Sequence, residues 1–314
     1  MSISRWTQTA GLLACLALAP ANHAAAPACG GHGDRGTMLV SSAWLAEHLR
    51  DANLVILSVG EKSEYDAGHI PGALFVDYME THTMPEPGHG LAVELPPMAE
   101  LAQTFGKLGV SNDSRIVLYM SHDWNSPTAR IFLTLDAMGL GAHTSILDGG
   151  FPVWKGEGRA VSAEVRKVTA GKLTPCPQSD IIADVDYVRT HLRQPGVDIV
   201  DARDPEFYSG ARIPRDQRAG HIPGASNITF STLVDDQGKL KSVEALQEKF
   251  RGAGIKPGDR VVSYCHIGQQ ASLVYFVARY LGYDARLYDG SWQDWSAHQE
   301  LPVEKPAEAA SAKQ

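Results

Sequence analysis

One seven-residue segment occurs twice in this chain and constrains its fold more than any other feature. Residues 67–73 read AGHIPGA, and residues 219–225 read AGHIPGA again. The segments around them correspond in the same order: the apolar run at 54–59 (LVILSV) corresponds to the run at 197–202 (VDIVDA). Short apolar runs that alternate with amphipathic stretches are typical of strands and helices in α/β folds. The sequence therefore predicts two copies of one α/β unit.

The two copies divide the chain into domains. They span about residues 39–160 and 180–300, and we expect each to form a mostly parallel sheet flanked by helices. Residues 163–179 are polar and contain two prolines, which predicts a linker. Residues 302–314, composed mainly of Ala, Lys, Glu and Pro, are predicted to be a disordered tail. A chain of 314 residues has room for roughly two domains of this size.

The N-terminus has the pattern of a signal peptide, which we assign to residues 1–25. An arginine precedes an apolar run at 10–19, and small residues then lead to expected cleavage after Ala24 or Ala25. The run is too short to span a bilayer. We expect an exported, periplasmic protein without a membrane partner in its mature form. The alternative is a lipoprotein attached through Cys15.

The charge balance restricts the class of partner. The net charge of −8 is spread without long runs, which argues against nucleic acid or an anionic membrane as the main partner. A small anionic substrate would need a local basic pocket to overcome this repulsion. We expect a monomer that acts on small molecules.

Cysteine usage sets one residue apart. Cys15 leaves with the signal peptide, so the mature chain keeps Cys29, Cys176 and Cys265. An oxidising compartment favours pairing, and Cys29 with Cys176 is the pair that would leave Cys265 as a free thiol. No cysteines or histidines have the spacing of a zinc site, so we expect no metal.

The segment around Cys265 predicts a strand, a loop and a helix. Residues 261–264 form a short apolar run, and 271–281 have apolar residues at helical spacing, with Gly282 as the stop. The free N–H groups of the first helical turn and a curled loop would favour a thiolate on Cys265. A small cysteine buried in a core is an equally consistent interpretation of this segment alone.

The positions at which the copies differ indicate where the function lies. Only the second copy has a cysteine, an aspartate and an arginine at the carboxyl ends of predicted strands, where open α/β sheets bind ligands. The aligned pairs are Cys265 with Met120, Asp201 with Ser58, and Arg203 with Gly60.

Two further features of the sequence are candidates for parts of a site. A nine-residue insertion before the second AGHIPGA contains Arg212, Arg215 and Arg218, which predicts either a basic rim for anions or a solvated loop. His69 and His221 recur in both copies, so we interpret them as structural residues of a tight turn rather than as catalytic groups.

Together these motifs resemble a tandem-domain rhodanese, a sulfurtransferase family. The resemblance rests on the duplicated unit, the paired AGHIPGA, the cysteine loop, and Asp-Gly-Gly or Asp-Gly-Ser before a tryptophan, and it covers nearly the whole mature chain. It implies a catalytically silent first domain, with Met120 in place of the nucleophile. It also implies a persulfide on Cys265 and an Arg203 that helps to bind the anionic group of the donor, with no metal or organic cofactor.

The loop after the cysteine leaves the donor open. Its sequence, HIGQQ, is neither the basic loop often found in thiosulfate-using relatives nor the Gly-Ser-Gly type usual in mercaptopyruvate-using relatives. We favour thiosulfate as the donor, with 3-mercaptopyruvate as the alternative. The residues expected to bind the donor are Asp201, Arg203, Arg212, His266, Ile267, Gly268, Gln269, Gln270 and Ala271.

The expected reaction is a two-step sulfur transfer. A Cys265 thiolate attacks the outer sulfur of the donor, and the persulfide then passes to a thiophilic acceptor such as cyanide or a thiol. A cysteine phosphatase or arsenate reductase needs an arginine six residues after the cysteine, and Ala271 occupies that position. A sulfur carrier without turnover is a further alternative, because a carrier could use the same cysteine.

Overall fold

The chain forms two α/β units of the same topology. The computed structural model describes residues 35–86, 89–123 and 125–305. The sheets have the strand orders β1-β5-β4-β2-β3 and β6-β10-β9-β7-β8, and every paired strand runs parallel to its neighbour. The fold class predicted from the duplicated sequence is therefore confirmed. The proposed signal peptide and Cys29 lie outside the described residues.

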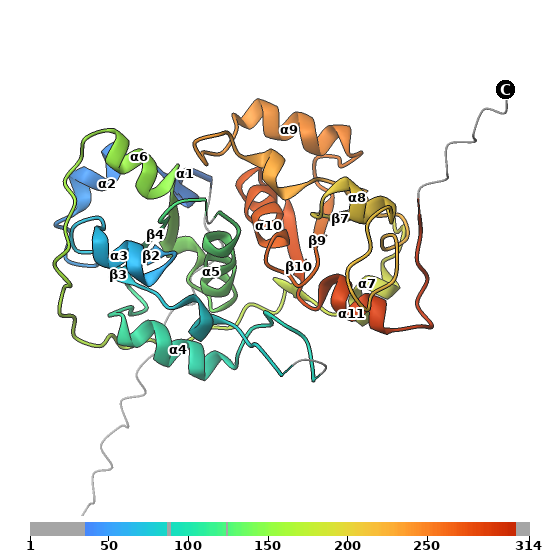
Figure 1. Cartoon of the computed structure of the whole chain (residues 1–314), viewed down its shortest axis with the longest axis horizontal. Coiled ribbons are helices and arrows are strands. Elements are labelled where there is room, and N and C mark those ends of the chain that lie inside the picture. Colours follow the sequence, from blue (N-terminus) through green and yellow to red (C-terminus); the bar gives the residue numbers. More distant parts are fainter. Residues whose placement is uncertain (1–34, 87–88, 124, 306–314) are drawn as a thin grey trace, which may run out of the picture.

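The first unit appears in blue to green in Figure 1. Its strands are β1 (Leu39–Val40), β2 (Leu54–Val59), β3 (Leu74–Phe75), β4 (Arg115–Met120) and β5 (Thr144–Leu147). Its helices are α1 (Arg35–Met38), α2 (Ser42–His48), α3 (Lys62–Ala67), η1 (Tyr78–Thr81), α4 (Met98–Lys107), α5 (Asn125–Ala137), η2 (Gly141–His143) and α6 (Gly150–Gly156).

The second unit appears in yellow to red in Figure 1. Its strands are β6 (Ile182–Ala183), β7 (Val197–Asp201), β8 (Ser226–Asn227), β9 (Arg260–Tyr264) and β10 (Asp284–Tyr288). Its helices are α7 (Val185–Thr190), α8 (Pro205–Ser209), η3 (Phe230–Leu233), α9 (Val243–Gly252), α10 (Ala271–Tyr280) and α11 (Ser291–Ala297). Among the residues described, no helix has the length and apolar character needed to cross a membrane.

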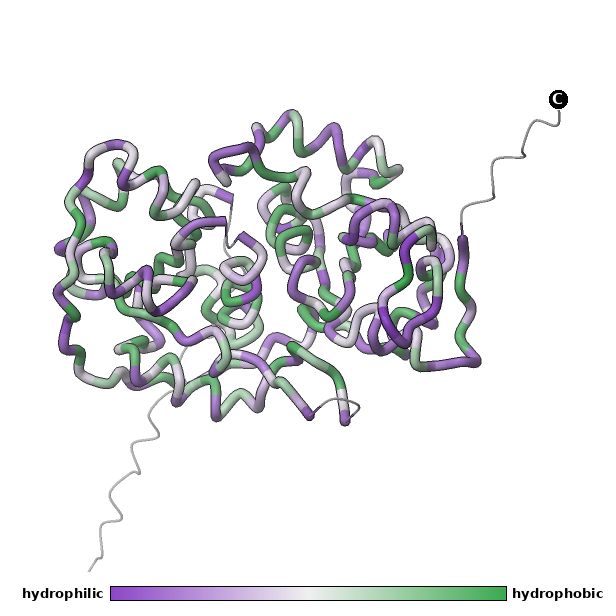
Figure 2. The backbone as a smooth tube through the Cα atoms, in the orientation of Figure 1, coloured by the Kyte–Doolittle hydropathy of each residue, from purple (hydrophilic) through white to green (hydrophobic). Residues whose placement is uncertain are grey.

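Local sequence signals explain where several helices begin. The side chains of Ser41, Asp184 and Ser242 accept hydrogen bonds from the backbone N–H groups of the first turns of α2, α7 and α9. Such caps satisfy donors that the helix itself leaves free, and each contributes about 1 kcal/mol. In α9 hydrophilic and hydrophobic residues alternate along the helix (Figure 2), and its Leu246 and Phe250 are buried against the core.

The strands of each sheet separate two layers of apolar side chains. In β4, Ile116 and Leu118 point to one face, whereas Val117 and Tyr119 point to the other, as expected for the two-residue period of a strand. One face of each sheet contacts a core that belongs to its own unit. The other faces of the two sheets contact a single core that both units share.

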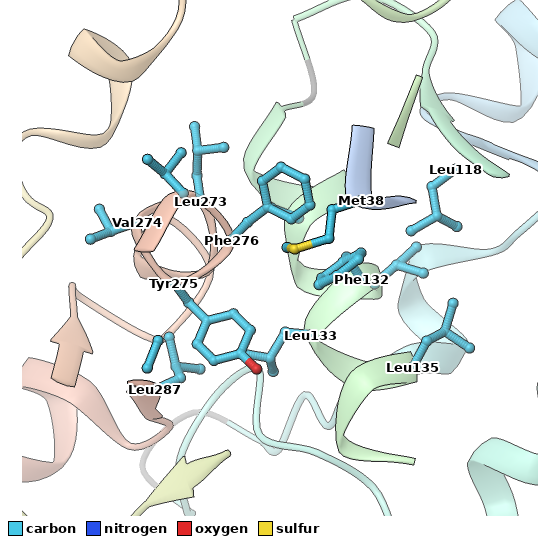
Figure 3. Close-up of a cluster of buried hydrophobic side chains, with 14 of the residues drawn as sticks. Met38, Leu118, Phe132, Leu133, Leu135, Leu273, Val274, Tyr275, Phe276 and Leu287 are labelled. Atoms are coloured by element: carbon cyan, nitrogen blue, oxygen red, sulfur yellow. The ribbon is translucent and has the colours of Figure 1, made fainter. Parts of the chain in front are cut away.

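Helices α5 and α10 form the centre of this shared core and lie side by side between the units (Figure 1). Phe132 of α5 meets Phe276 of α10 edge to face, with ring centroids 4.8 Å apart and an interplanar angle of 85°. Figure 3 shows the surrounding cluster, in which Leu133 and Leu135 come from the first unit and Leu287 from the second. The two units are therefore joined by tightly packed apolar side chains, and an aromatic pair of this geometry adds about 1 kcal/mol.

The position of α10 corrects one sequence expectation. Apolar spacing predicted a helix at 271–281 with a single buried face, but residues 271–278 are all buried. The reason is that α10 lies between its own sheet and α5 of the other unit. Leu281 is the C-cap, and Gly282 follows with a φ of 90°, which agrees with the predicted stop.

The repeated histidines are structural, as the sequence indicated. His69 is 1% exposed and stacks on Tyr65 at 4.0 Å, and His221 is 3% exposed and stacks on Tyr208 at 3.8 Å. Each Nδ1 lies 2.8 Å from the backbone oxygen of the tyrosine on which it stacks. These histidines therefore hold the AGHIPGA turn of each unit in place, which is a structural role.

The expected linker and tail differ in their contacts. Residues 163–179 contain no helix or strand, but the backbone N–H of Cys176 donates to Met138 at 2.9 Å, so the segment lies along the first unit. The disordered tail was expected from residue 302, yet Glu304 pairs with His221 in a β-bridge and with Arg193 in an ion pair of 2.6 Å. Residues up to 305 are thus fixed by contacts with the second unit, and 306–314 lie outside the described residues.

Candidate active site

Cys265 follows β9 directly and lies inside the loop that leads into α10. It is a free cysteine and only 1% exposed. Burial raises the pKa of the Cys265 thiol, whereas backbone N–H groups that hydrogen-bond to it lower that pKa. These N–H groups belong to Ala271, Ile267, Gln270 and Gly268. The loop therefore forms a cradle of N–H donors around the sulfur, which suits a negative charge there.

The curl of the loop depends on Gly268. Its φ is 83°, a left-handed conformation that glycine adopts without strain. A Cβ at this position would lie 3.0 Å from the backbone oxygen of Asp289 and 3.1 Å from Nη1 of Arg130. The first turn of α11 holds the loop in place, because the N–H of Trp292 donates to the Cys265 carbonyl at 3.0 Å. Only glycine fits this position without displacing its neighbours.

The resemblance implied that Arg203 helps to bind the anionic group of the donor, but the Arg203 side chain is not exposed to solvent. Its side chain is fully buried and forms an ion pair with the equally buried Asp201, with Nη2 2.6 Å from Oδ2. The guanidinium also lies 4.6 Å from the ring centroid of Trp292, and Nη2 donates to the Gly220 carbonyl. Burial lowers the pKa of Arg203, but its hydrogen bonds and charge attraction to Asp201 raise it above the usual value, with smaller contributions from Tyr264 and Cys265. The charge of Arg203 is therefore balanced mainly by Asp201.

The other predicted residues of this loop surround its outer side. His266 packs edge to face on Phe207 at 4.5 Å, and burial with the nearby Arg203 charge lowers its pKa to about 4. Arg212 is exposed and its guanidinium lies 4.8 Å from the same Phe207 ring. Arg218 instead donates to the carbonyls of Leu301 and Trp295 at 2.7 Å, so it supports the C-terminal segment and is not part of a basic rim.

The first unit also contributes to the surroundings of Cys265. Tyr78 of η1 donates from its hydroxyl to Oε1 of Gln269 at 3.1 Å. Burial raises the pKa of the Tyr78 phenol, the Arg130 charge opposes this, and the Cys265 thiolate adds to it. Arg130 of α5 is fully buried and pairs with Asp289 of the second unit at 2.6 Å. The cysteine loop is thus enclosed by side chains from both units.

A chamber of about 300 Å³ opens on this loop between the units. It is lined by Tyr78, Asp123, Ser126, Phe230, Gln269 and Gln270, together with a proline of α5. A neighbouring cavity of about 450 Å³ shares two of these residues, Asp123 and Phe230, and extends over Met120. The chamber is large enough for a small-molecule substrate at the low end of the usual range.

Met120 occupies the position in the first unit that Cys265 has in the second. It ends β4, and the side chain lies against Gly238 of the second unit, where an added Cβ would be 2.4 Å from Cε. The chain after it differs from the cysteine loop, since Ser121 donates to Glu64 at 2.5 Å and His122 lies 2.9 Å from Glu64. A thioether in this position cannot form a persulfide.

The sequence profile of the rhodanese-like domain matches the chain twice, at residues 41–157 and 184–298. The chain belongs to the rhodanese family. This agrees with the resemblance seen in the duplicated motifs, and the chain is a rhodanese-type sulfurtransferase.

Several relatives cover nearly the whole rhodanese pair. A thiosulfate sulfurtransferase of Pseudomonas aeruginosa is 31% identical over 85% of this chain and 97% of its own length. A sulfur carrier protein, TtuD, of Thermus thermophilus is 33% identical over 86% of this chain and 98% of its own length. The crystal structure of YnjE has a TM-score of 0.77 at 23% identity, covering 85% of this chain and 68% of that chain. The last likeness concerns the fold alone.

Sequence reasoning missed the contribution of the first unit to the rhodanese site. Tyr78, Arg130 and Ser126 were not singled out, because the first unit was interpreted as silent and examined only at its own strand ends. One signal was available: an arginine lies within the apolar spacing of residues 129–135, where a helix in a core would have an apolar side chain. A charged residue in such a run points to a buried partner, which is Asp289.

Proposed function

We propose that this rhodanese moves a sulfane sulfur from an anionic donor to a thiophilic acceptor through a persulfide on Cys265, and that thiosulfate is the favoured donor. The single observation that carries the proposal is the cradle of four backbone N–H groups around the Cys265 sulfur. Such donors stabilise a thiolate before the reaction and a persulfide after it, without the need to reorganise. The buried, free state of Cys265 also protects the persulfide from water and from stray thiols.

The transfer has two steps. In the first, the Cys265 thiolate attacks the outer sulfur of thiosulfate; a sulfur–sulfur bond forms to Cys265, the sulfur–sulfur bond of the donor breaks, and sulfite leaves with the electron pair. In the second, cyanide or a thiolate attacks the outer sulfur, and the Cys265 thiolate is released. This is nucleophilic catalysis with ping-pong kinetics. The Arg203 charge favours both anionic forms of Cys265.

The test of the nucleophile is the change Cys265→Ser. We expect no detectable sulfur transfer and no mass increase by one sulfur atom after incubation with thiosulfate, because the hydroxyl of serine cannot form a persulfide. Cys176 is disulfide-bonded, and its partner lies outside the described residues, so the pairing with Cys29 stays a prediction. Cys176→Ala is the matched control and should keep turnover. Transfer retained by Cys265→Ser would overturn the assignment.

The alternatives for donor and role are separated by kinetics. A 3-mercaptopyruvate sulfurtransferase would load Cys265 faster from 3-mercaptopyruvate than from thiosulfate. A sulfur carrier, the role named for the Thermus relative, would accept one equivalent of sulfur and release it only to a protein partner. Parallel measurements of loading and of steady-state turnover with both donors and cyanide distinguish these outcomes. Multiple turnovers with thiosulfate support the enzyme proposed here.

We also infer export to the periplasm, from the pattern of residues 1–25 in the sequence. Mass spectrometry of the mature protein should give an N-terminus after Ala24 or Ala25. A mass that includes Met1, or a lipid on Cys15, would contradict this proposal.

A further inference from the structure

Two residues that line the chamber beside the cysteine loop each have a buried polar atom without a hydrogen-bond partner among the described residues. These atoms are the hydroxyl oxygen of Ser126 and the side-chain carbonyl oxygen Oε1 of Gln270. Ser126 is only 5% exposed, so its unpartnered hydroxyl is a property of the site and not of the surface. Leaving such a group unsatisfied typically costs roughly 1–3 kcal/mol. Two unpartnered atoms in one cavity indicate a ligand that supplies their partners.

The chemistry of the chamber favours hydrogen-bond donors on that ligand. The Gln270 oxygen can only accept, the Ser126 hydroxyl can accept, and the carboxylate of Asp123 accepts and carries a negative charge. Asp123 is 90% exposed, with Oδ1 2.9 Å from Nε2 of His122. Among the described residues that line the chamber, none is a lysine or an arginine. A group with several N–H donors and a positive charge fits this lining.

The approach to the chamber has the same character. The neighbouring cavity shares Asp123 and Phe230 with the chamber and adds Asp235 and Asp236. Aspartates thus line part of both cavities, while Phe230 supplies an apolar surface where they meet. Carboxylates at these positions attract a cationic group.

We propose that the chamber binds the sulfur acceptor, and that this acceptor is a small thiol that carries a protonated amine. The inference rests on the proposed function, because it requires a persulfide on Cys265. The ammonium group contacts Gln270 and Ser126 and faces Asp123, and the aliphatic part lies on Phe230. Gln270 connects the two groups, since its N–H donates to the Cys265 sulfur and its side chain lines the chamber.

The transfer step is balanced without any further reactant. The acceptor thiol loses its proton to solvent, and its thiolate attacks the outer sulfur of the Cys265 persulfide. A new sulfur–sulfur bond forms to the acceptor, the bond to Cys265 breaks, and the electron pair remains on Cys265 as a thiolate. The acceptor leaves as an aminothiol persulfide. The persulfide carries its outer sulfur about 2 Å beyond the buried cysteine sulfur.

Three acceptors that differ in one group test the inference. The enzyme is first loaded with thiosulfate and freed of excess donor, and the loss of persulfide is followed with cysteamine, 2-mercaptoethanol or 3-mercaptopropionate at equal thiolate concentration. We expect cysteamine to react about tenfold faster than 2-mercaptoethanol, the effect of one charge-assisted contact, and 3-mercaptopropionate to be the slowest. Equal rates, or a faster carboxylate, would overturn the inference.

Variants separate a direct contact from a general field. Asp123→Asn should reduce the preference for cysteamine over 2-mercaptoethanol by about fivefold, and Ser126→Ala by about threefold. Asp236→Asn is the matched control: it removes the same charge from the neighbouring cavity, does not line the chamber, and should reduce the preference much less than Asp123→Asn does. An equal effect of Asp236→Asn would mean that the field alone selects the acceptor, which contradicts the proposed contact.

The design also separates this inference from the proposed function. If thiosulfate forms no persulfide on Cys265 in the wild-type protein, the proposed function fails before any acceptor is added. If the persulfide forms and reacts with all three thiols without preference, the proposed function stands and the aminothiol inference fails. Thermal unfolding of each variant, compared with the wild type, shows that the preferences are measured on folded protein.

Discussion

The two units contain two clefts of the same design, and only one of them contains a nucleophile. The 3₁₀ segment of each unit covers the strand-end loop of the other, and the central helix of each unit sends a side chain toward that loop. Cys265 corresponds to Met120, Tyr78 corresponds to Phe230, and Arg130 corresponds to Leu273. The polar members of these pairs meet at Cys265, and the apolar members meet at Met120. The first unit therefore supplies side chains to the cysteine loop of the second.

One pair of hydrogen bonds makes the correspondence explicit. Asp289 accepts from the backbone N–H of Leu95 at 3.0 Å, and Asp148 accepts from that of Leu240 at 3.0 Å. In each case an aspartate of the Asp-Gly motif holds a loop of the opposite unit. The scaffold of the clefts is thus retained on both sides, and the difference lies in a few side chains that decide the chemistry.

Moving the thiol between the clefts should have the largest effect. We expect the double variant Cys265→Ser/Met120→Cys to form no persulfide with thiosulfate, because the segment after Met120 differs from the cysteine loop, with Ser121 and His122 bonded to Glu64. Mass spectrometry after incubation with thiosulfate measures this directly. A persulfide on the new cysteine would show that the two strand ends are equivalent and that only the residue type differs.

The second effect in size concerns the buried pair of Arg203 and Asp201, whose counterparts are Gly60 and Ser58. Arg203→Ala should lower the free energy of unfolding by about 4 kcal/mol, because the fully buried Asp201 loses its partner. Chemical denaturation measures the change, and KM for thiosulfate is determined on the same protein.

A variant that copies the silent unit is the control for this pair. Asp201→Ser/Arg203→Gly removes both charges and should be more stable than Arg203→Ala alone, since Tyr264 can bond to a serine as Tyr119 does to Ser58. Unchanged stability of Arg203→Ala together with a strongly raised KM would mean that Arg203 binds the donor directly.

The ion pair across the units should give a smaller effect. Arg130→Leu introduces the side chain found at the corresponding position in α10 and leaves the buried carboxylate of Asp289 without its ion-pair partner. We expect a loss of about 3 kcal/mol in the free energy of unfolding and slower loading from thiosulfate, since the Arg130 side chain lies next to Gly268 of the cysteine loop. Arg130→Leu/Asp289→Asn should regain part of the stability. Wild-type stability of the single variant would argue against a role for this pair.

The sequence predicted the duplicated fold and the position of the cysteine well, because both depend on local patterns. Strand and helix periods, the AGHIPGA turn and the aligned Cys265 and Met120 are all readable along the chain. The contacts of Arg203 were not, because an arginine two residues after an aspartate can point to solvent or fold back on it, and the burial of Asp201 decides this.

The parts of the site that come from the opposite unit could not be predicted for a physical reason. Tyr78 and Ser126 reach the cysteine loop only because α5 and α10 are in contact. That contact depends on the shape of two apolar surfaces, and no pattern in either unit alone encodes it. The burial of α10 on more than one side has the same origin.

The smallest predicted effect concerns a residue near the amino-terminal end of β7, whereas the cysteine loop follows the carboxyl end of β9. Burial and the neighbouring Asp259 raise the pKa of Asp198 to about 6, and the corresponding residue of the first unit is Val55. A carboxyl whose pKa is raised on folding destabilises the fold as pH rises from about 4 to about 6, because ionisation is easier in the unfolded chain. The pair is partly exposed, so screening limits the penalty at neutral pH to about 1 kcal/mol.

Asp198→Asn tests this directly. It should stabilise the protein by about 1 kcal/mol at pH 7 and have no effect near pH 4. Thermal unfolding at both pH values, with the exposed Asp113→Asn as the control, measures the difference. A stabilisation of equal size at both pH values would exclude ionisation of Asp198 as its cause.

The shared core between the sheets also determines how the protein unfolds. Duplicated chains often melt one copy at a time, with the first copy gone while the second persists. Here α10 would expose Tyr275 and Phe276 to water as soon as α5 left, and the shared core on one face of each sheet would open. Both units should therefore unfold on heating in one cooperative transition, with a calorimetric enthalpy of unfolding equal to the van't Hoff enthalpy. An inherited duplication has in this way become a single thermodynamic unit.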